Sequence, residues 1–241
     1  MAITIGPGIA IGAGISVTPA PASIVTTGLV LSLDAGNPAS YPGSGTTWTD
    51  TVSSIAFTLN NGPAYSSNNG GYLEFVPASA QWANSSTSLA SLSNWSVETW
   101  HYYTDNNTGS LPCLITETFV GGDINYTLGW PTSPPSFQAG YFTGGWLVTP
   151  TGYTLTPDAW YQIVGTYDGT TIKLYVNNTL INQASSTYTS ISSSSGIRLM
   201  NRWDSADYWG GRLGIVRIYD DALTAEQVTQ NYNADRSRFG L

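Results

Sequence analysis

Alternating apolar and polar residues indicate a group of β-strands in the middle of the chain. Two runs rich in Val, Ile, Thr, Tyr and Trp flank Asp168-Gly169, a dipeptide that suits the positive φ angles of a tight hairpin turn. After this turn, one parity is apolar and the other is mostly polar, and the apolar positions are Ile172, Leu174 and Val176. Asn177-Asn178 offers a second turn, after which 179–184 can fold back as a third strand. The pattern predicts an antiparallel meander with one face toward a core.

Further strands and one helix are predicted on either side of this meander. Large side chains occur at both parities from Trp95 to Tyr103, which favours a strand buried on one face and roofed by loops on the other. Shorter strand patterns are found at 29–34, 71–75, 124–128, 136–142 and 211–219. Thr224 and Gln227 have the spacing of a capping box, so a short helix is expected at 225–235. The pattern therefore predicts an all-β chain with one short C-terminal helix.

The first 27 residues differ in pattern from the rest. Isoleucines alternate there with small residues, at Ile3, Ile5, Ile9, Ile11 and Ile15, and the intervening glycines and proline destabilise a helix. We therefore expect an extended apolar arm and linker over 1–27 that binds a partner, for example by strand addition. A disordered leader is the alternative. Residues 28–241 are expected to form one domain, because a chain of 241 residues with 41% hydrophobic content can bury a sizeable core.

Three segments, in this order along the chain, resemble the laminin-G-like domains with a concanavalin A-like jelly roll. They are the strand Asn94–Trp100, the hairpin around Asp168-Gly169, and the last strand Gly211–Asp220 with the helix after it. The resemblance implies a two-sheet antiparallel jelly-roll sandwich, here with an extended N-terminal arm. The opening of the domain, from Gly28 to Phe75, is most similar to modules in structural proteins of tailed bacteriophages. Lectins, glycosidases, adhesion modules and virion proteins share this fold, so the fold does not identify a function.

The charge distribution argues against several classes of partner. The formal net charge is −8, and the first Lys or Arg is Lys173. Such a surface repels phosphate backbones, so no nucleic-acid partner is expected. No run of about 18 apolar residues is present, so no membrane span is expected. The N-terminus lacks the basic stretch of a secretion signal, and Cys113 is the only cysteine, so no intrachain disulfide is expected.

Aromatic residues gather between 119 and 153, where glycines and prolines interrupt the strand pattern. Rings in such loops can stack on the apolar faces of sugars, and the candidate carbohydrate-binding residues are Tyr126, Trp130, Tyr141 and Trp146. The alternative, which ranks ahead, is that these rings fill the sandwich and its subunit contacts, because aromatic side chains are common in any β-core or interface. A surface glycan is therefore one of two explanations for this segment.

Acidic residues are sparse, and this limits the catalytic and metal chemistry that we expect. Glycoside hydrolysis needs two carboxylates beside the scissile bond, and only Glu98 of the four glutamates lies on a suitable strand. We therefore predict no enzyme activity and no catalytic residues, and His101 is expected to be a packed or surface imidazole. Calcium is the one ion considered, with Asp204 and Asp207, or Asp34, as ligands. Their spacing is not that of an EF-hand, so solvated carboxylates are the simpler interpretation and no cofactor is expected.

Two functions fit these observations. The first is a non-enzymatic bacteriophage virion structural protein, a capsid decoration (cement) or fibre protein. It would be made in the host cytoplasm and anchored by its N-terminal arm to a capsid or other virion protein, and a homo-oligomer such as a trimer would suit this role. The second is a carbohydrate-binding adhesin that recognises glycans on the host surface. A decoration protein can also recognise a surface, so the two functions are compatible.

Overall fold

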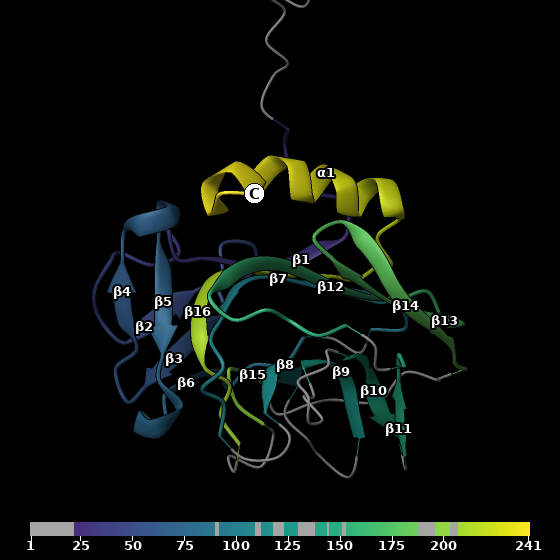
Figure 1. The fold of residues 1–241 in the computed structure, drawn as a ribbon, viewed down its shortest axis with the longest axis horizontal. Coiled ribbons are helices and arrows are strands. Elements are labelled where there is room, and N and C mark those ends of the chain that lie inside the picture. Colours follow the sequence, from purple (N-terminus) through teal and green to yellow (C-terminus); the bar gives the residue numbers. More distant parts are fainter. Residues whose placement is uncertain are drawn as a thin grey trace, which may run out of the picture.

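Two β-sheets packed face to face, with one α-helix on the outside, form the body of the protein (Figure 1). The computed structural model describes residues 22–89, 92–108, 112–117, 123–129, 138–143, 145–150, 153–187, 196–202 and 207–241. Neighbouring strands in both sheets run antiparallel. The prediction of an all-β, two-sheet antiparallel jelly-roll sandwich with a short C-terminal helix is therefore confirmed.

Sheet A lies directly beneath the helix in Figure 1. The order of its hydrogen-bonded strands is β14 (Thr179–Ser185), β13 (Thr171–Val176), β12 (Ala159–Tyr167), β7 (Trp95–Tyr103), β16 (Gly211–Tyr219), β5 (Tyr72–Phe75) and β4 (Ala64–Ser66). β1 (Leu29–Asp34) also pairs with β16. The nine-residue strands β7, β12 and β16 lie at the centre of this sheet, so they form the platform on which the helix rests.

Sheet B forms the opposite layer of the sandwich, below sheet A in Figure 1. Its strands are ordered β11 (Trp146–Val148), β10 (Gln138–Thr143), β9 (Asp123–Gly129), β8 (Cys113–Glu117), β15 (Ile197–Leu199), β6 (Trp82–Ser85), β3 (Ala56–Asn60) and β2 (Thr47–Thr49). Short 3-10 helices η1 (Asn68–Gly70) and η2 (Pro77–Ser79) flank β5 in the sequence. The chain thus alternates between the two sheets, and the core lies between them.

The β12–β13 hairpin and the turn after it confirm the predicted meander. Asp168-Gly169 forms the first turn, and the glycine has a φ of +89°. The Asp168 carboxylate accepts hydrogen bonds from the backbone N–H groups of Thr170 and Thr171, at 2.9 and 2.8 Å, which closes the turn. Asn177-Asn178 forms the second turn, with φ angles of +46° and +65°. Asparagine tolerates this left-handed region better than most residues, so the local sequence explains both turns.

Aromatic rings from both sheets meet in the core. The inward parity of β7 contributes Trp95, whose ring centroid lies 6.2 Å from that of Tyr126 on β9. Tyr141 on β10 lies 5.4 Å from Tyr167 on β12. All four rings are fully buried. Large side chains at inward strand positions therefore join the two layers of the sandwich.

The outward parity of β7 is covered by the C-terminal segment rather than by the loops expected from the sequence. Phe239, in the 3-10 helix η3 (Arg236–Phe239), stacks on Trp100 with ring centroids 4.6 Å apart. Tyr232 of α1 (Ala225–Asp235) also stacks on Trp100, at 5.8 Å. Trp100, on the outward side of β7, is thus buried against the C-terminal helices, which the alternation pattern alone does not specify.

Local sequence explains where α1 begins. The predicted capping box forms, because the Gln227 backbone N–H donates to the Thr224 hydroxyl at 3.3 Å and the Thr224 backbone N–H donates to the Gln227 side chain at 2.8 Å. Val228, one turn later, is fully buried against sheet A. Within the described ranges, no helix combines the length and the apolar character required to cross a bilayer.

A buried network of polar side chains also fastens α1 to sheet A. Glu98 on β7 accepts hydrogen bonds from Gln162 at 2.8 Å and from Asn231 of the helix at 2.7 Å. Arg217 on β16 contacts both Glu98, at 3.4 Å, and Asp235 of the helix, at 2.6 Å. Buried charges are tolerated only when they are paired and hydrogen bonded, so these five side chains depend on one another.

The chain enters the domain beside α1. Val25 is buried, its N–H donates to the Asn231 side chain at 2.8 Å, and its carbonyl accepts from the Tyr219 hydroxyl at 3.2 Å. The backbone before β1 is therefore fastened to the outer, helix-covered side of sheet A. The isoleucines expected to bind a partner lie outside the described residues, at Ile3, Ile5, Ile9, Ile11 and Ile15.

Candidate functional site

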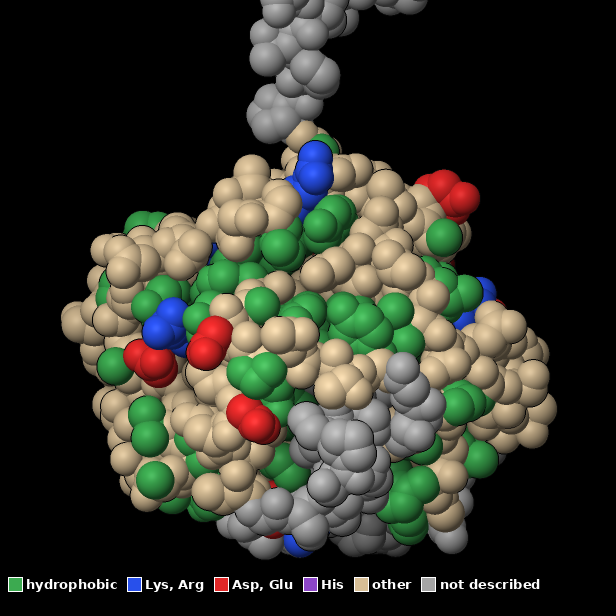
Figure 2. Space-filling model, viewed as in Figure 1, with side chains coloured by type: hydrophobic (Ala, Val, Ile, Leu, Met, Phe, Trp, Pro, Cys, Tyr) green, Lys and Arg blue, Asp and Glu red, His purple; other side chains and the backbone are tan. Residues whose placement is uncertain are grey.

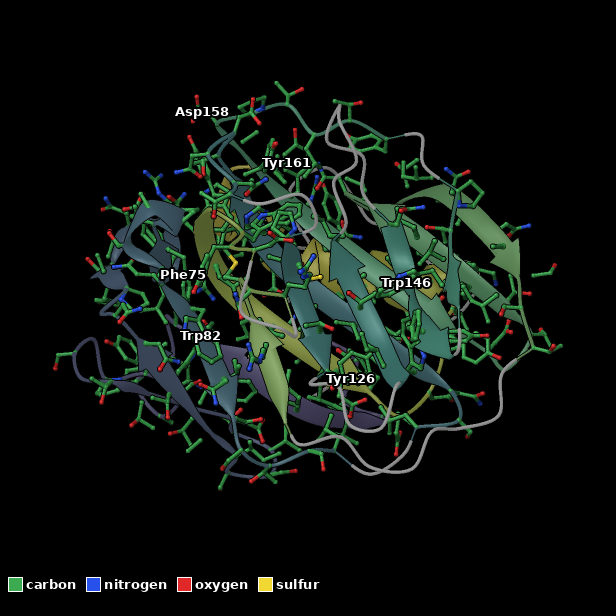
Figure 3. All side chains as sticks on the ribbon, turned by 90° about the horizontal axis from the view of Figure 1, so that it is seen from below. Phe75, Trp82, Tyr126, Trp146, Asp158 and Tyr161 are labelled. Atoms are coloured by element: carbon green, nitrogen blue, oxygen red, sulfur yellow. The ribbon has the colours of Figure 1, made fainter. Side chains whose placement is uncertain are left out.

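A half-buried tryptophan on the outer face of sheet B, Trp82, is the centre of the candidate site (Figure 3). The strand register places Thr58, Asn84 and Arg198 in one row across β3, β6 and β15, and Asn60 beside Trp82 in the next row. Their neighbours along these strands are buried in the core, so the alternation of a strand directs these five side chains outward. We call these five residues the Trp82 surface.

Side-chain contacts hold the Trp82 surface in one arrangement. The guanidinium carbon of Arg198 lies 4.6 Å from the centroid of the Trp82 ring, within the range of a cation–π contact. Arg198 Nη1 also donates to Asn201 Oδ1 at 2.9 Å, which fixes the position of the guanidinium. Asn60 Nδ2 donates to Asn84 Oδ1 at 2.9 Å. The aromatic ring and the amides are therefore positioned before any ligand arrives.

These groups suit a ligand with one apolar face and several hydroxyl groups. The Trp82 ring supplies apolar contact area at a low cost in conformational entropy. Side-chain amides of Asn60 and Asn84 both donate and accept hydrogen bonds, as hydroxyl groups do. The Thr58 hydroxyl is exposed in the same row. An aromatic ring bordered by hydrogen-bonding groups is the usual composition of a small-molecule site.

A second aromatic pair lies on the same outer face, at the other end of sheet B. Phe142 on β10 faces Trp146 on β11 directly, with ring centroids 5.0 Å apart and ring planes at 64°. Both rings are half-buried. Trp146 and Trp82 are separated by five strand spacings in the sheet order, which corresponds to on the order of 24 Å. An extended ligand can span these two positions, whereas a single sugar can contact only one of them.

The structure separates the four aromatic residues that the sequence grouped together. Tyr126 and Tyr141 point into the core, and burial raises the pKa of the Tyr126 hydroxyl well above its usual value. Burial likewise raises the pKa of Tyr141 to about 12, although a hydrogen bond with the Ser186 hydroxyl opposes this shift. Trp146 is half-buried on the outer face, and Trp130 lies outside the described residues. Trp146 is therefore the described member of the group whose ring reaches the surface.

Sequence reasoning did not select the residues of the Trp82 surface. Trp82 is the first residue of the four-residue strand β6, which follows η2. Arg198 belongs to the three-residue strand β15, which is too short for a clear alternation pattern. Their contact depends on the pairing of β6 with β15, strands separated by more than a hundred residues in the chain. The one local signal was a tryptophan that follows a turn at the start of a strand.

The structure describes two of the three candidate calcium ligands. Asp207 is buried, and its carboxylate forms an ion pair with Arg202 at 2.8 Å. Asp34, the other aspartate considered, forms an ion pair with Arg238 at 2.8 Å, while Asp204 lies outside the described residues. Among the residues that the structure describes, no three His, Cys, Asp or Glu side chains form a group suited to a metal ion. The expectation that the protein holds no cofactor, with calcium as the one alternative, therefore stays a prediction.

His101 packs among aromatic residues, as the sequence predicted. The imidazole is fully buried on the inward side of β7, and its Nε2 accepts a hydrogen bond from the indole N–H of Trp209 at 2.9 Å. Burial lowers the pKa of His101 to about 3, so the ring is neutral at physiological pH. Cys113 is likewise buried, and the Thr127 hydroxyl contacts its sulfur at 3.7 Å. Both side chains contribute to packing.

A comparison with protein families identifies the fold from the sequence. Residues 77–229 match the Laminin_G_3 family model, which is described as the concanavalin A-like lectin/glucanases superfamily. The match runs from η2 into α1 and covers more than half of the chain. The predicted laminin-G-like, concanavalin A-like jelly roll is confirmed, and the likeness to bacteriophage modules stays a prediction. No curated protein matches the chain.

Solved structures share the fold at low sequence identity. Domain 4 of AbnA, a GH43 extracellular arabinanase from Geobacillus stearothermophilus in complex with arabinotriose, has a TM-score of 0.67 and 17% identity, over 85% of this chain and 98% of that chain. The binding domain of Paraclostridial Mosquitocidal Protein 1 has a TM-score of 0.65 and 14% identity, over 86% and 52%. Trypanosoma rangeli sialidase with sialic acid has a TM-score of 0.64 and 13% identity, over 90% and 34%. The chain spans about half of the second protein and a third of the third.

These matches overturn the prediction that the chain is not an enzyme. That prediction assumed that too few paired carboxylates were present on suitable strands. The structural neighbours include parts of glycoside hydrolases, an arabinanase and a sialidase. At identities of 12–17% they show the fold alone, and this fold permits either an enzyme or a binding module. The fold of the chain therefore gives no ground for excluding catalysis.

Proposed function

Because the chain belongs to the concanavalin A-like lectin/glucanases superfamily, we propose that it is a carbohydrate-binding structural protein of a bacteriophage virion. In this proposal it is a capsid decoration or fibre protein, and its N-terminal arm displays the jelly-roll domain. The observation that carries the proposal is that the entry of the chain and the candidate site lie on opposite sides of the domain. The chain enters on the outer side of sheet A, whereas the Trp82 surface lies on the outer side of sheet B.

This arrangement on opposite sides suits a domain that is held at one side and binds a ligand at the other. Val25 is fastened to Asn231 of α1, and α1 lies on the side of sheet A that faces away from sheet B (Figure 1). In this proposal, the body that holds residues 1–21 lies on the helix side of the domain. The Trp82 surface then points away from that body and stays accessible to a ligand.

Two further observations support the virion role and the ligand class. The opening of the domain resembles modules of tailed-bacteriophage structural proteins, which is why the arm is assigned a capsid or other virion protein as its partner. Solved structures with this fold include an arabinanase domain with arabinotriose and a sialidase with sialic acid, so saccharides are the first ligands to test. A homo-oligomer such as a trimer would present several Trp82 surfaces at once and raise avidity without any new contact.

A glycan array followed by titration tests the carbohydrate-binding part of the proposal. The wild-type protein should bind a subset of glycans, and Trp82→Ala should weaken that binding by about tenfold or more, on the order of 1.4 kcal/mol, because the ring supplies the apolar contact. Val52→Ala is the matched control, since Val52 is an exposed apolar residue outside the Trp82 surface. An empty array, or equal affinity of Trp82→Ala and wild type, would count against the proposal.

A truncation tests the anchoring part. Removing residues 1–21 leaves Val25 and its contact with Asn231 in place, so the domain should keep its thermal unfolding midpoint. The truncated protein should no longer attach to particles in a sedimentation assay with purified virions. Retention of full attachment would show that the arm is not the anchor. A large drop in the unfolding midpoint would instead show that residues 1–21 belong to the domain.

A further inference from the structure

A second row of polar and aromatic side chains lies on the outer face of sheet A, beyond the end of α1. The strand register places Glu74 beside Arg212, Arg212 beside Tyr102, and Tyr102 beside Trp160, across β5, β16, β7 and β12. Tyr72 lies on the same face of β5 as Glu74. Figure 2 shows basic and acidic atoms next to each other over β5 and β16. We call these five residues the Arg212 row.

The C-terminal segment stops short of the Arg212 row. Phe239 of η3 packs on Trp160 with ring centroids 4.5 Å apart, and this is where the covered part of sheet A ends. Tyr102 is half-buried, and the side chains of Arg212 and Glu74 keep 29% and 40% of their surface exposed. The row therefore continues the buried aromatic cluster under η3 outward to solvent.

Arg212 is held in place by the rings on which it lies. Its guanidinium carbon is 4.5 Å from the centroid of the Tyr102 ring and 5.0 Å from that of Tyr72. Arg212 Nε contacts Glu74 Oε1 at 3.3 Å. Among the described residues, no hydrogen-bond acceptor is assigned to the two terminal nitrogens of Arg212. A guanidinium positioned in this way is preorganised to donate two parallel hydrogen bonds to a planar carboxylate.

We propose that the Arg212 row is a second saccharide site and that it selects sugars carrying a carboxylate, such as uronic acids. The ligand carboxylate accepts hydrogen bonds from the terminal nitrogens of Arg212. The sugar ring lies along the exposed part of Tyr102, toward Trp160. The inference rests on the proposed carbohydrate-binding function for its ligand class, but it uses a different face of the sandwich.

Glu74 favours a saccharide over other ligands with a carboxylate. Its carboxylate beside Arg212 accepts hydrogen bonds from sugar hydroxyls, whereas it repels a second acidic group of an acidic peptide. The overall charge of −8 acts against an acidic ligand at long range, but salt screens exposed charges beyond about 8 Å at physiological ionic strength. The contacts at Arg212 are shorter than this screening length, so selectivity is decided there.

Calorimetric titration at physiological ionic strength tests this site with two ligands. The acidic trimer is a galactose trimer in which one unit is replaced by galacturonic acid, and the neutral trimer is the galactose trimer of the same linkage. We expect the wild-type protein to bind the acidic trimer at least tenfold more tightly. Arg212→Gln should remove this preference, and Arg212→Lys should restore only part of it, because an ammonium group lacks the planar fork. Arg236→Gln is the matched control. It removes the same charge from an exposed arginine near the ring of Tyr232, outside the row, and should leave both affinities unchanged.

Three results would overturn the inference: no preference for the acidic trimer, equal losses in Arg212→Gln and Arg236→Gln, or no binding of either trimer. The variant Trp82→Ala separates the two sites. If Trp82→Ala abolishes binding of the acidic trimer and Arg212→Gln does not, the inference fails and the proposed function stands. If only Arg212→Gln weakens it, the second site stands, and the role of the Trp82 surface is decided by the glycan array alone.

Discussion

The two outer faces of the sandwich place a tryptophan in different surroundings. On sheet A, the rings of Phe239 and Tyr232 stack on Trp100, which has no exposed surface. On sheet B, Trp82 is half-buried, and Arg198 lies over its ring. Both side chains occupy outward strand positions. The comparison shows that an outward tryptophan is a packing residue where a helix covers the sheet and a candidate binding residue where none does.

The same substitution on the two faces should separate these roles. Trp100→Ala should lower the free energy of unfolding by about 3–5 kcal/mol, because it removes a fully buried ring and leaves a cavity beneath α1. Trp82→Ala should cost about 1 kcal/mol or less, since its ring is only half-buried. Urea unfolding followed by tryptophan fluorescence or circular dichroism measures both. Equal losses in the two variants would contradict the contrast between the faces.

Replacing a buried and an exposed glutamate on sheet A tests whether burial decides how much an ion pair contributes to the free energy of unfolding. Glu98→Ala should cost about 3 kcal/mol or more, because Arg217 then keeps a buried charge with one acidic partner fewer. Glu74→Ala removes a glutamate from an exposed pair with Arg212 and should cost about 0–1 kcal/mol. Urea unfolding at neutral pH compares the two. A small effect of Glu98→Ala would show that the buried network does not fasten α1.

The burial of His101 on the inward side of β7 can be tested through the pH dependence of the free energy of unfolding. The pKa of His101 is lowered by burial to about 3, from an ordinary value of about 6.5. Below about pH 6.5 the unfolded chain binds a proton that the folded chain does not bind. The free energy of unfolding should therefore fall by about 1.4 kcal/mol per pH unit as the pH decreases toward 3, and this contribution is fully present above pH 6.5.

His101 is the only histidine, so the slope between about pH 6.5 and pH 5 isolates it from the carboxylates. His101→Gln should flatten this part of the curve, whatever its effect on absolute stability. Unfolding curves recorded at a series of pH values provide the measurement. A slope that persists in His101→Gln would assign the pH dependence to other groups.

Local patterns predicted the elements of this protein well. The Asp168-Gly169 hairpin, the Asn177-Asn178 turn and the Thr224 capping box all form where the sequence placed them. Each depends on side chains that hydrogen bond to nearby backbone or tolerate a left-handed φ angle. Such signals act within a few residues, so they can be recognised without knowledge of the fold.

The candidate site was less predictable, because it depends on which side of a strand faces the core. Tyr126, Tyr141 and Trp146 looked equivalent as aromatic residues in one irregular segment. The structure turns the first two inward, where they pack with Trp95 and Tyr167, and turns Trp146 outward. Alternation shows that neighbouring residues face opposite ways, but it does not say which way is the core.

The sequence by itself determined the longer strands, the turns, the C-terminal helix and the family of the fold, because these follow from alternation, turn chemistry and capping over short spans. The tertiary structure alone decided which outward residues are covered. The partners of Trp100 and Trp82 come from η3 and β15, far away in the chain, and they meet only when the sheets and the helix pack. Burial is a property of such long-range contacts, so it separates a structural tryptophan from an available one only in the folded protein.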